Sequence, residues 1–131
     1  MLTAAALLVT AFLFGGMVLY SFGFAAFLFT ALPAETAGAT IRKAFPWFYL
    51  FVIATASLAA LLSFSNDAFS AATLGLIALT TVPTRQWLMP AINAATDSGN
   101  KGRFKALHGA SVVITLVHIG LAGWVLIRFL P

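Results

Sequence analysis

The chain has 131 residues, of which 62% are hydrophobic and only 8% are charged, and its mean hydropathy is +1.04. This composition excludes an ordinary soluble domain, in which about a quarter of the residues are charged, and the length accommodates one domain. The net charge of +4 comes from seven basic residues scattered between apolar segments, which argues against a nucleic-acid surface, and the lack of cysteine excludes disulfides and thiolate metal sites.

Four apolar stretches are long enough to cross a bilayer, whose core needs about 20 mostly apolar residues per helix. They occupy about residues 4–32, 46–64, 68–89 and 104–130. The first stretch lacks the positively charged start of a signal peptide, so we expect it to be retained as a span. The sequence thus predicts an all-α protein, an integral membrane four-helix bundle in which residues 1–131 form a single transmembrane domain.

The first span carries small residues at Gly15, Gly16 and Gly23. Small side chains let two membrane helices approach closely, so these glycines predict a helix-packing groove rather than a ligand site. Tyr20 lies among them near the middle of the membrane, where its hydroxyl needs a hydrogen-bond partner. We expect the polar face of the fourth span to supply that partner.

Residues 34–44, between the first two spans, are compatible with a short helix of their own. Arg42 and Lys43 fall in its last turn, where positive charge complements the helix dipole. We expect a short amphipathic interfacial helix here, lying on the membrane surface, with Pro46 opening the second span.

The third helix is too long for one crossing, since it would rise roughly 40 Å before the next break. We expect bends at Pro83 and Pro90, and a projecting end that carries Asp97. Arg85 is the only basic residue inside this apolar run. It either extends to the membrane surface or forms an ion pair with Glu35 or Asp97.

The fourth span holds the most informative pattern. His108, Ser111, Thr115, His118 and Ala122 are spaced three and four residues apart, so they fall within about 80° of one helix face. Polar side chains in membrane helices face the bundle or a wet cavity. We therefore expect this stripe to point at the other helices and to form interhelical hydrogen bonds.

A second interpretation makes His108 an axial haem ligand, because neutral imidazole binds iron and a helical bundle can hold a porphyrin. His118 cannot share that iron, since the two histidines lie about 15 Å apart along the helix. Tyr20 or a methionine, Met17 or Met89, would then complete the cofactor site. The first interpretation predicts no cofactor, and neither predicts another metal site.

Groups for catalysis are few. The only carboxylates are Glu35, Asp67 and Asp97, and the predicted topology puts Asp67 on the opposite side from the other two. No phosphate-binding glycine loop or zinc motif occurs. The sequence therefore leans against an enzyme.

The basic residues indicate an orientation. Arg42 and Lys43 precede the second span, and Lys101, Arg103 and Lys105 lie at the start of the fourth. Because cytoplasmic connections carry an excess of lysine and arginine, we expect both basic connections in the cytoplasm and both termini outside. We expect the location to be the cell membrane, the inner membrane of a bacterium.

Four stretches of the sequence resemble a known family: GGMVLYSFGFAAFLFTALPAETAG, RKAFPWFYLF, LMPAINAATDSG and RFKALHGASVVITLV. They are similar to a family of small bacterial membrane proteins of unknown function, which is related to eukaryotic transmembrane protein 205. The resemblance covers about residues 14–117 and implies four helices, a membrane location and no established activity. His118 does not match the family pattern. The positions that the resemblance marks are Gly15, Gly16, Phe45, Tyr49, Pro90, Asn93, His108 and Ser111.

These observations lead to three hypotheses. The first is a non-catalytic accessory or helix-packing subunit, set in the lipid bilayer, that associates with itself or with a larger membrane protein and not with nucleic acid. The second is a haem- or metal-handling protein that uses His108. The third is a small-solute or lipid transporter that acts as an oligomer.

Overall fold

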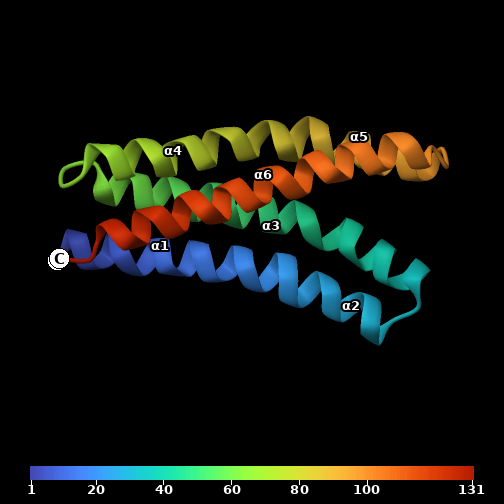
Figure 1. Cartoon of the computed structure of the whole chain (residues 1–131), viewed down its shortest axis with the longest axis horizontal. Helices are drawn as coiled ribbons and strands as arrows, with labels where there is room; N and C mark the ends of the chain where they lie inside the picture. Colours follow the sequence, from blue (N-terminus) through green and yellow to red (C-terminus); the bar gives the residue numbers. More distant parts are fainter.

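A computed structural model describes all residues, 1–131. The chain forms four long helices, and Figure 1 shows that they run alternately in opposite directions. The model has no strands, which confirms the predicted all-α fold. Two of the helices contain a π-helical segment, labelled η. The helices are, in chain order, α1 (Leu2–Val18) continued by η1 (Leu19–Phe24) and α2 (Ala25–Ala31); α3 (Ala34–Ser63); α4 (Ala68–Pro83) continued by η2 (Thr84–Leu88) and α5 (Met89–Asp97); and α6 (Lys101–Arg128).

The breaks between the helices follow from the residues found there. Leu32 is extended, as residues before a proline tend to be, and this ends α2 ahead of Pro33. The carboxylate of Asp67 accepts two backbone N–H groups in the first turn of α4, which caps that helix. Gly99 takes a positive φ of 66°, suited to glycine, and Asn100 caps α6 directly after it.

The predicted separate interfacial helix over residues 34–44 is wrong, because this segment forms the first turns of α3, which continues through Pro46 without a break. Proline has no N–H to donate, so it leaves one side of the helix open. The carbonyl that Pro46 cannot bond is that of Arg42, four residues earlier. Two other carbonyls of this stretch accept from neighbouring helices: the Tyr20 hydroxyl donates to Ala44 O at 3.0 Å, and Arg85 Nε donates to Pro46 O at 3.3 Å. These contacts tie the stretch around Pro46 to its neighbours, and the helix continues where the sequence suggested a boundary.

The helices pack around one core. The α3 helix lies against α1 and α4, and α6 lies against α1, α4 and α5. Ala56, Ala59 and Ala122 are completely buried, and such small side chains let the helices approach closely. The large, fully buried apolar side chains between them are Leu13, Met17, Val52, Leu74, Ile77 and Val125.

The bundle has two chemically different ends. At the termini end, both chain termini lie with the connection between α3 and α4, and Thr3, Ser63 and Arg128 line one hollow. At the basic end, Arg42 near the start of α3 pairs with Asp97 at the end of α5. The up-and-down arrangement in Figure 1 therefore brings both basic connections to the same end.

Three of the helices, Leu2–Ala31, Ala34–Ser63 and Lys101–Arg128, are long and apolar enough to cross a membrane. Large apolar side chains such as Phe12 and Leu61 are exposed on their outer faces. Apolar surface of this kind suits contact with lipid better than contact with water. By length and composition, these helices indicate a membrane protein.

Candidate functional site

The polar face predicted on α6 points into the bundle from Ser111 onwards, but His108 is not part of it. Ser111 and His118 are only 8% and 7% exposed, and Thr115 between them is half-buried. His108 lies on the exposed surface of α6, where its ring stacks on Phe104 with centroids 5.2 Å apart. Ten residues turn His108 about 80° around the helix from His118, which carries it off the inward face.

Two hydrogen bonds tie this polar face to the neighbouring helices. The hydroxyl groups of Tyr49 and Ser111 lie 3.2 Å apart and join α3 to α6. The Thr80 hydroxyl lies 2.8 Å from Nε2 of His118 and joins α4 to α6. Interhelical bonds of this kind contribute about 1 kcal/mol each in membrane proteins.

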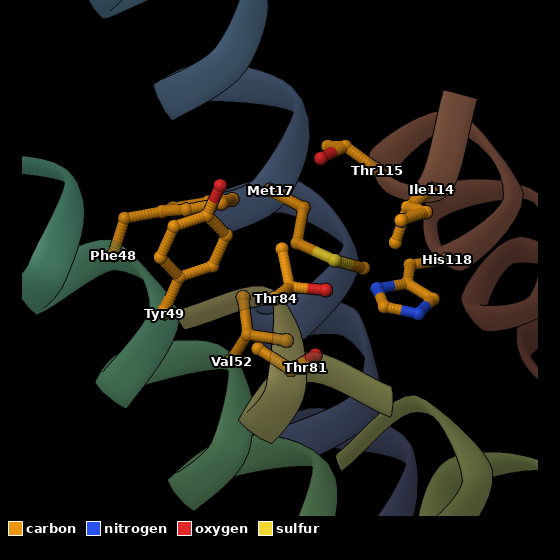
Figure 2. A pocket seen from close by; sticks show the side chains of 9 residues that line it. All are labelled: Met17, Phe48, Tyr49, Val52, Thr81, Thr84, Ile114, Thr115 and His118. Atoms are coloured by element: carbon orange, nitrogen blue, oxygen red, sulfur yellow. The ribbon is translucent and has the colours of Figure 1, made fainter. Parts of the chain in front are cut away.

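Between these bonds lies a cavity of about 10 Å³, which is room for one water molecule. We call it the central cavity. Figure 2 shows the His118 ring on one side of it and Tyr49 and Val52 on the other. Its lining comes from all four long helices and consists of Met17, Phe48, Tyr49, Val52, Thr81, Thr84, Ile114, Thr115 and His118.

The π-helical segment η2 contributes Thr84 to this cavity. Pro83 and Pro90 flank the segment, and each lacks the N–H that would bond the carbonyl four residues earlier. A π-turn is one way in which a helix absorbs such a missing bond, and π-turns are frequent at functional sites. The sequence predicted bends at these two prolines, and the structure places a π-helical turn between them.

Tyr20 lies in η1, and its hydroxyl donates to Ala44 O of α3 at 3.0 Å. Its ring packs against phenylalanines of η1 and α3. The prediction that α6 supplies the partner of Tyr20 is therefore wrong. Tyr20 and His108, combined in the haem interpretation, are not brought together, because His108 stacks on the outer surface of α6.

The three glycines of the predicted packing groove have different surroundings. A Cβ atom on Gly16 would overlap the Phe51 ring of α3, so this glycine marks a close approach of two helices. A Cβ on Gly15 would meet nothing within 4 Å, and one on Gly23 would meet only Leu19 of the same helix. Of the three, only Gly16 lies against another helix.

Arg85 makes no ion pair in the structure. Its Nε donates to Pro46 O of α3, and the carboxylate expected as its alternative partner, Asp97, lies 2.8 Å from Nη2 of Arg42 instead. Asn93 O accepts a second bond from Arg42 at 3.2 Å. The sequence did not reveal this pair, because its members are 55 positions apart.

A second ion pair closes the termini end. Arg128 Nε and Nη2 donate to the two carboxylate oxygens of Asp67 at 3.0 and 3.1 Å. The Ser70 hydroxyl, which donates to the same carboxylate at 2.6 Å, and the Arg128 guanidinium hold the pKa of Asp67 below its usual value. A hollow of about 270 Å³ adjoins this pair, and Ser63 and Asn66 also line it.

The chemistry that these groups offer is hydrogen bonding. No group of three or more histidine, cysteine, aspartate or glutamate side chains lies together anywhere in the chain. Sequence reasoning missed Thr80 and Tyr49 as the partners of the α6 face. The available signal was the cluster Thr80, Thr81 and Thr84 within an apolar run, because hydroxyl groups there need partners inside the bundle.

Comparison with protein families gives a match to a model described as "Domain of unknown function (DUF4149)" over residues 8–101. No curated protein and no solved structure matches the chain. The matched region ends where α6 begins, so His118 and the rest of the α6 polar face lie outside it. The match agrees with the expected membership of a family of unknown function, and the relation to transmembrane protein 205 stays a prediction.

Proposed function

The chain belongs to the DUF4149 family of unknown function, and from this premise we propose that it is a non-catalytic accessory subunit that crosses the membrane four times. Its role is association, with itself or with a larger membrane protein. The observation that carries the proposal is the way the interior is filled: the polar face of α6 bonds to α3 and α4, and the central cavity has room for one water molecule. The central cavity is too small for a substrate, and the larger hollow, of about 270 Å³, lies at the termini end beside Asp67 and Arg128. We therefore place the protein's activity at the surface of the bundle.

The arrangement of the ends supports four crossings. The helix Ala68–Asp97 runs alongside the three helices that are apolar enough to span a membrane. Arg42 and Lys101 both belong to the basic end, and such residues remain on the cytoplasmic side of a membrane. We place the basic end in the cytoplasm and the termini end outside, with the protein in the inner membrane of a bacterium.

The polar stripe and Gly16 are used inside the chain, so association needs another surface. The outer face of α6 offers one, because three of the six exposed residues there are alanine or glycine and all six follow helical spacing. Without a hydrophobic driving force in lipid, helices associate where small side chains allow close packing. This association face consists of Ala106, Ala110, Val113, Val117, Gly120 and Trp124.

Native mass measurement after extraction in mild detergent tests the proposal. We expect the protein at a multiple of its 13.8 kDa mass, or in complex with a larger protein. In the variant Gly120→Leu, the added side chain covers the association face, and we expect the complex to dissociate. Ala72→Leu places the same side chain on an exposed position of α4 and serves as the matched control.

Two results would contradict the proposal. The first is a lone monomer in every mild detergent and in lipid nanodiscs. The second is a complex that survives Gly120→Leu but not Ala72→Leu, which would move the association face to α4.

The haem alternative now takes a different form. Because His108 is exposed on α6, it could serve as a ligand only at a surface shared with a second subunit. That form predicts a Soret band in the purified complex that disappears in His108→Ala. A colourless complex from haem-replete cells favours association without a cofactor.

A further inference from the structure

The central cavity differs from the rest of the core because five of its lining residues carry polar groups. The hydroxyl of one of them, Tyr49, already pairs with that of Ser111 at 3.2 Å. The other four are Thr81, Thr84, Thr115 and His118. Most of the core around it is apolar. Polar groups facing a cavity lose hydrogen bonds to water unless something inside the cavity replaces them. The hydrogen-bonding character of these four groups therefore decides what the cavity can hold.

The three hydroxyl groups have already committed their hydrogens. Thr81 Oγ1 donates to Ile77 O at 2.7 Å, and Thr84 Oγ1 donates to Thr80 O at 2.9 Å. Thr115 Oγ1 donates to the carbonyl four residues earlier in α6, at 3.0 Å. A hydroxyl has one hydrogen and two lone pairs, so each of these oxygens can offer the cavity only an acceptor.

The tautomer of His118 follows from the same count of hydrogen-bond donors and acceptors. Thr80 Oγ1 donates its hydrogen to Leu76 O at 2.7 Å, so its contact with Nε2 of His118 must be one in which Nε2–H donates. In the neutral ring, Nδ1 then carries a lone pair and no hydrogen. Figure 2 shows this second ring nitrogen on the side of Met17 and Thr84, toward the cavity.

We infer that the central cavity binds one water molecule, which donates one hydrogen to Nδ1 of His118 and the other to a threonine hydroxyl oxygen. The volume of about 10 Å³ admits one such molecule, and a donor is what a lining of acceptors requires. The inference goes beyond the proposed function, and it rests only on the interior of the bundle.

A cation would also match a lining of acceptors, and ammonium has the size of water. The charge balance argues against it, because no carboxylate lines the cavity and Asp67 and Asp97 lie at the two ends of the bundle. A buried charge without a counter-charge is far more costly than a buried neutral donor. The site is therefore one for water and for neutral donors of water's size.

Nitrogen NMR of the protein with labelled histidine, in lipid nanodiscs, tests this inference. The variant His108→Gln removes the other histidine, which is exposed, and leaves one ring to observe. We expect a neutral ring at neutral pH with hydrogen on Nε2, a hydrogen-bonded Nδ1, and a cross-peak between water and the ring. We expect Thr80→Val to shift the ring toward the Nδ1–H form, because the acceptor for Nε2–H is gone and the water can accept instead.

The matched control is Thr73→Val, on the same helix. Thr73 donates to Phe69 O at 2.9 Å in the same manner but does not line the cavity, so its replacement should leave the spectrum of His118 unchanged. Should Thr80→Val fail to fold, Thr115→Val removes one acceptor of the cavity and should weaken the water cross-peak.

Three outcomes would overturn the inference. A ring with hydrogen on Nδ1 in the parent protein contradicts the tautomer. A free, unbonded Nδ1 without a water cross-peak indicates a dry cavity. A doubly protonated ring at neutral pH, or a His118 spectrum that changes when ammonium chloride replaces sodium chloride, indicates a cation site.

Discussion

The two ends of the bundle each carry one ion pair between distant segments of the chain, and the two pairs are built differently. At the termini end, Arg128 makes two parallel bonds to Asp67, at 3.0 and 3.1 Å. At the basic end, Arg42 makes a single bond to Asp97 at 2.8 Å. The side chain of Asp97 is 64% exposed, whereas that of Asp67 is 31% exposed.

We expect the pair at the termini end to be the stronger one, although its contacts are longer. Asp67 is fixed before Arg128 reaches it, because the first turn of α4 donates two backbone N–H groups and the Ser70 hydroxyl donates a third bond. Pairing with Arg128 therefore costs the Asp67 side chain little conformational freedom. The Arg128 guanidinium also lies over the Phe69 ring, 4.8 Å from the ring centroid. At the basic end, Arg42 also donates to Asn93 O at 3.2 Å, but no other group holds the Asp97 carboxylate, and water screens the attraction of this exposed pair.

The largest effect should follow from removing the two carboxylates in turn. Asp67→Ala removes a helix cap together with the ion pair, and we expect it to lower the free energy of unfolding by about 2 kcal/mol. For Asp97→Ala we expect a loss of less than about 1 kcal/mol, as for other exposed pairs. Unfolding by a denaturing detergent, followed by circular dichroism, measures both. Equal losses of stability, or a larger loss for Asp97→Ala, would contradict the expected difference between the two ends.

The middle of the bundle, between the two ends, offers a matched pair of neighbouring glycines. Gly16→Leu must displace the Phe51 ring, and we expect a loss of about 1.5 kcal/mol from overpacking. Gly15→Leu meets open space and should leave the stability nearly unchanged. The same unfolding measurement compares the two variants. A large loss of stability in Gly15→Leu would show that the outer face at Gly15 is also packed against another group.

The smallest effect should be the dependence of stability on acid. The folded pKa of Asp67 lies below its unfolded value, chiefly because the Ser70 hydroxyl donates to the charged form and Arg128 lies beside it. Its stabilisation is thus present above the unfolded pKa and is lost as the pH falls through the folded pKa, below about 4. We expect Asp67→Asn to unfold with a weaker acid dependence than the parent. If the parent and Asp67→Asn lost stability in acid to the same extent, Asp67 would not be the group responsible.

Much of the fold could be predicted from the sequence, because local signals decided it. Four long helices, three of them apolar enough to span a membrane, and the breaks at Pro33, Asp67 and Gly99 all depend on residues close in the chain. The inward face of α6 from Ser111 onwards also followed from helical spacing. These features need no knowledge of which helices become neighbours.

The rest could not be predicted, because it depends on contacts between distant residues. Pro46 signalled a helix boundary, yet α3 continues through it, and the contacts that hold this stretch come from Tyr20 and Arg85 on other helices. The hydrogen bond from Tyr20 to Ala44 O of α3 likewise joins two residues that are distant in the sequence. His108 fits the spacing of the polar face yet stacks on Phe104 at the surface, since it lies at the edge of that face.

The proposed function depends on how the chain is threaded through lipid, and the lack of cysteine makes this threading directly measurable. Single variants Glu35→Cys, Ser98→Cys and Ser65→Cys place one thiol at an exposed site in each connection region. With a maleimide that cannot cross membranes, we predict that intact cells label only Ser65→Cys, and that Glu35→Cys and Ser98→Cys react together once the membrane is opened. Labelling of Glu35→Cys and Ser98→Cys from opposite sides would contradict the account.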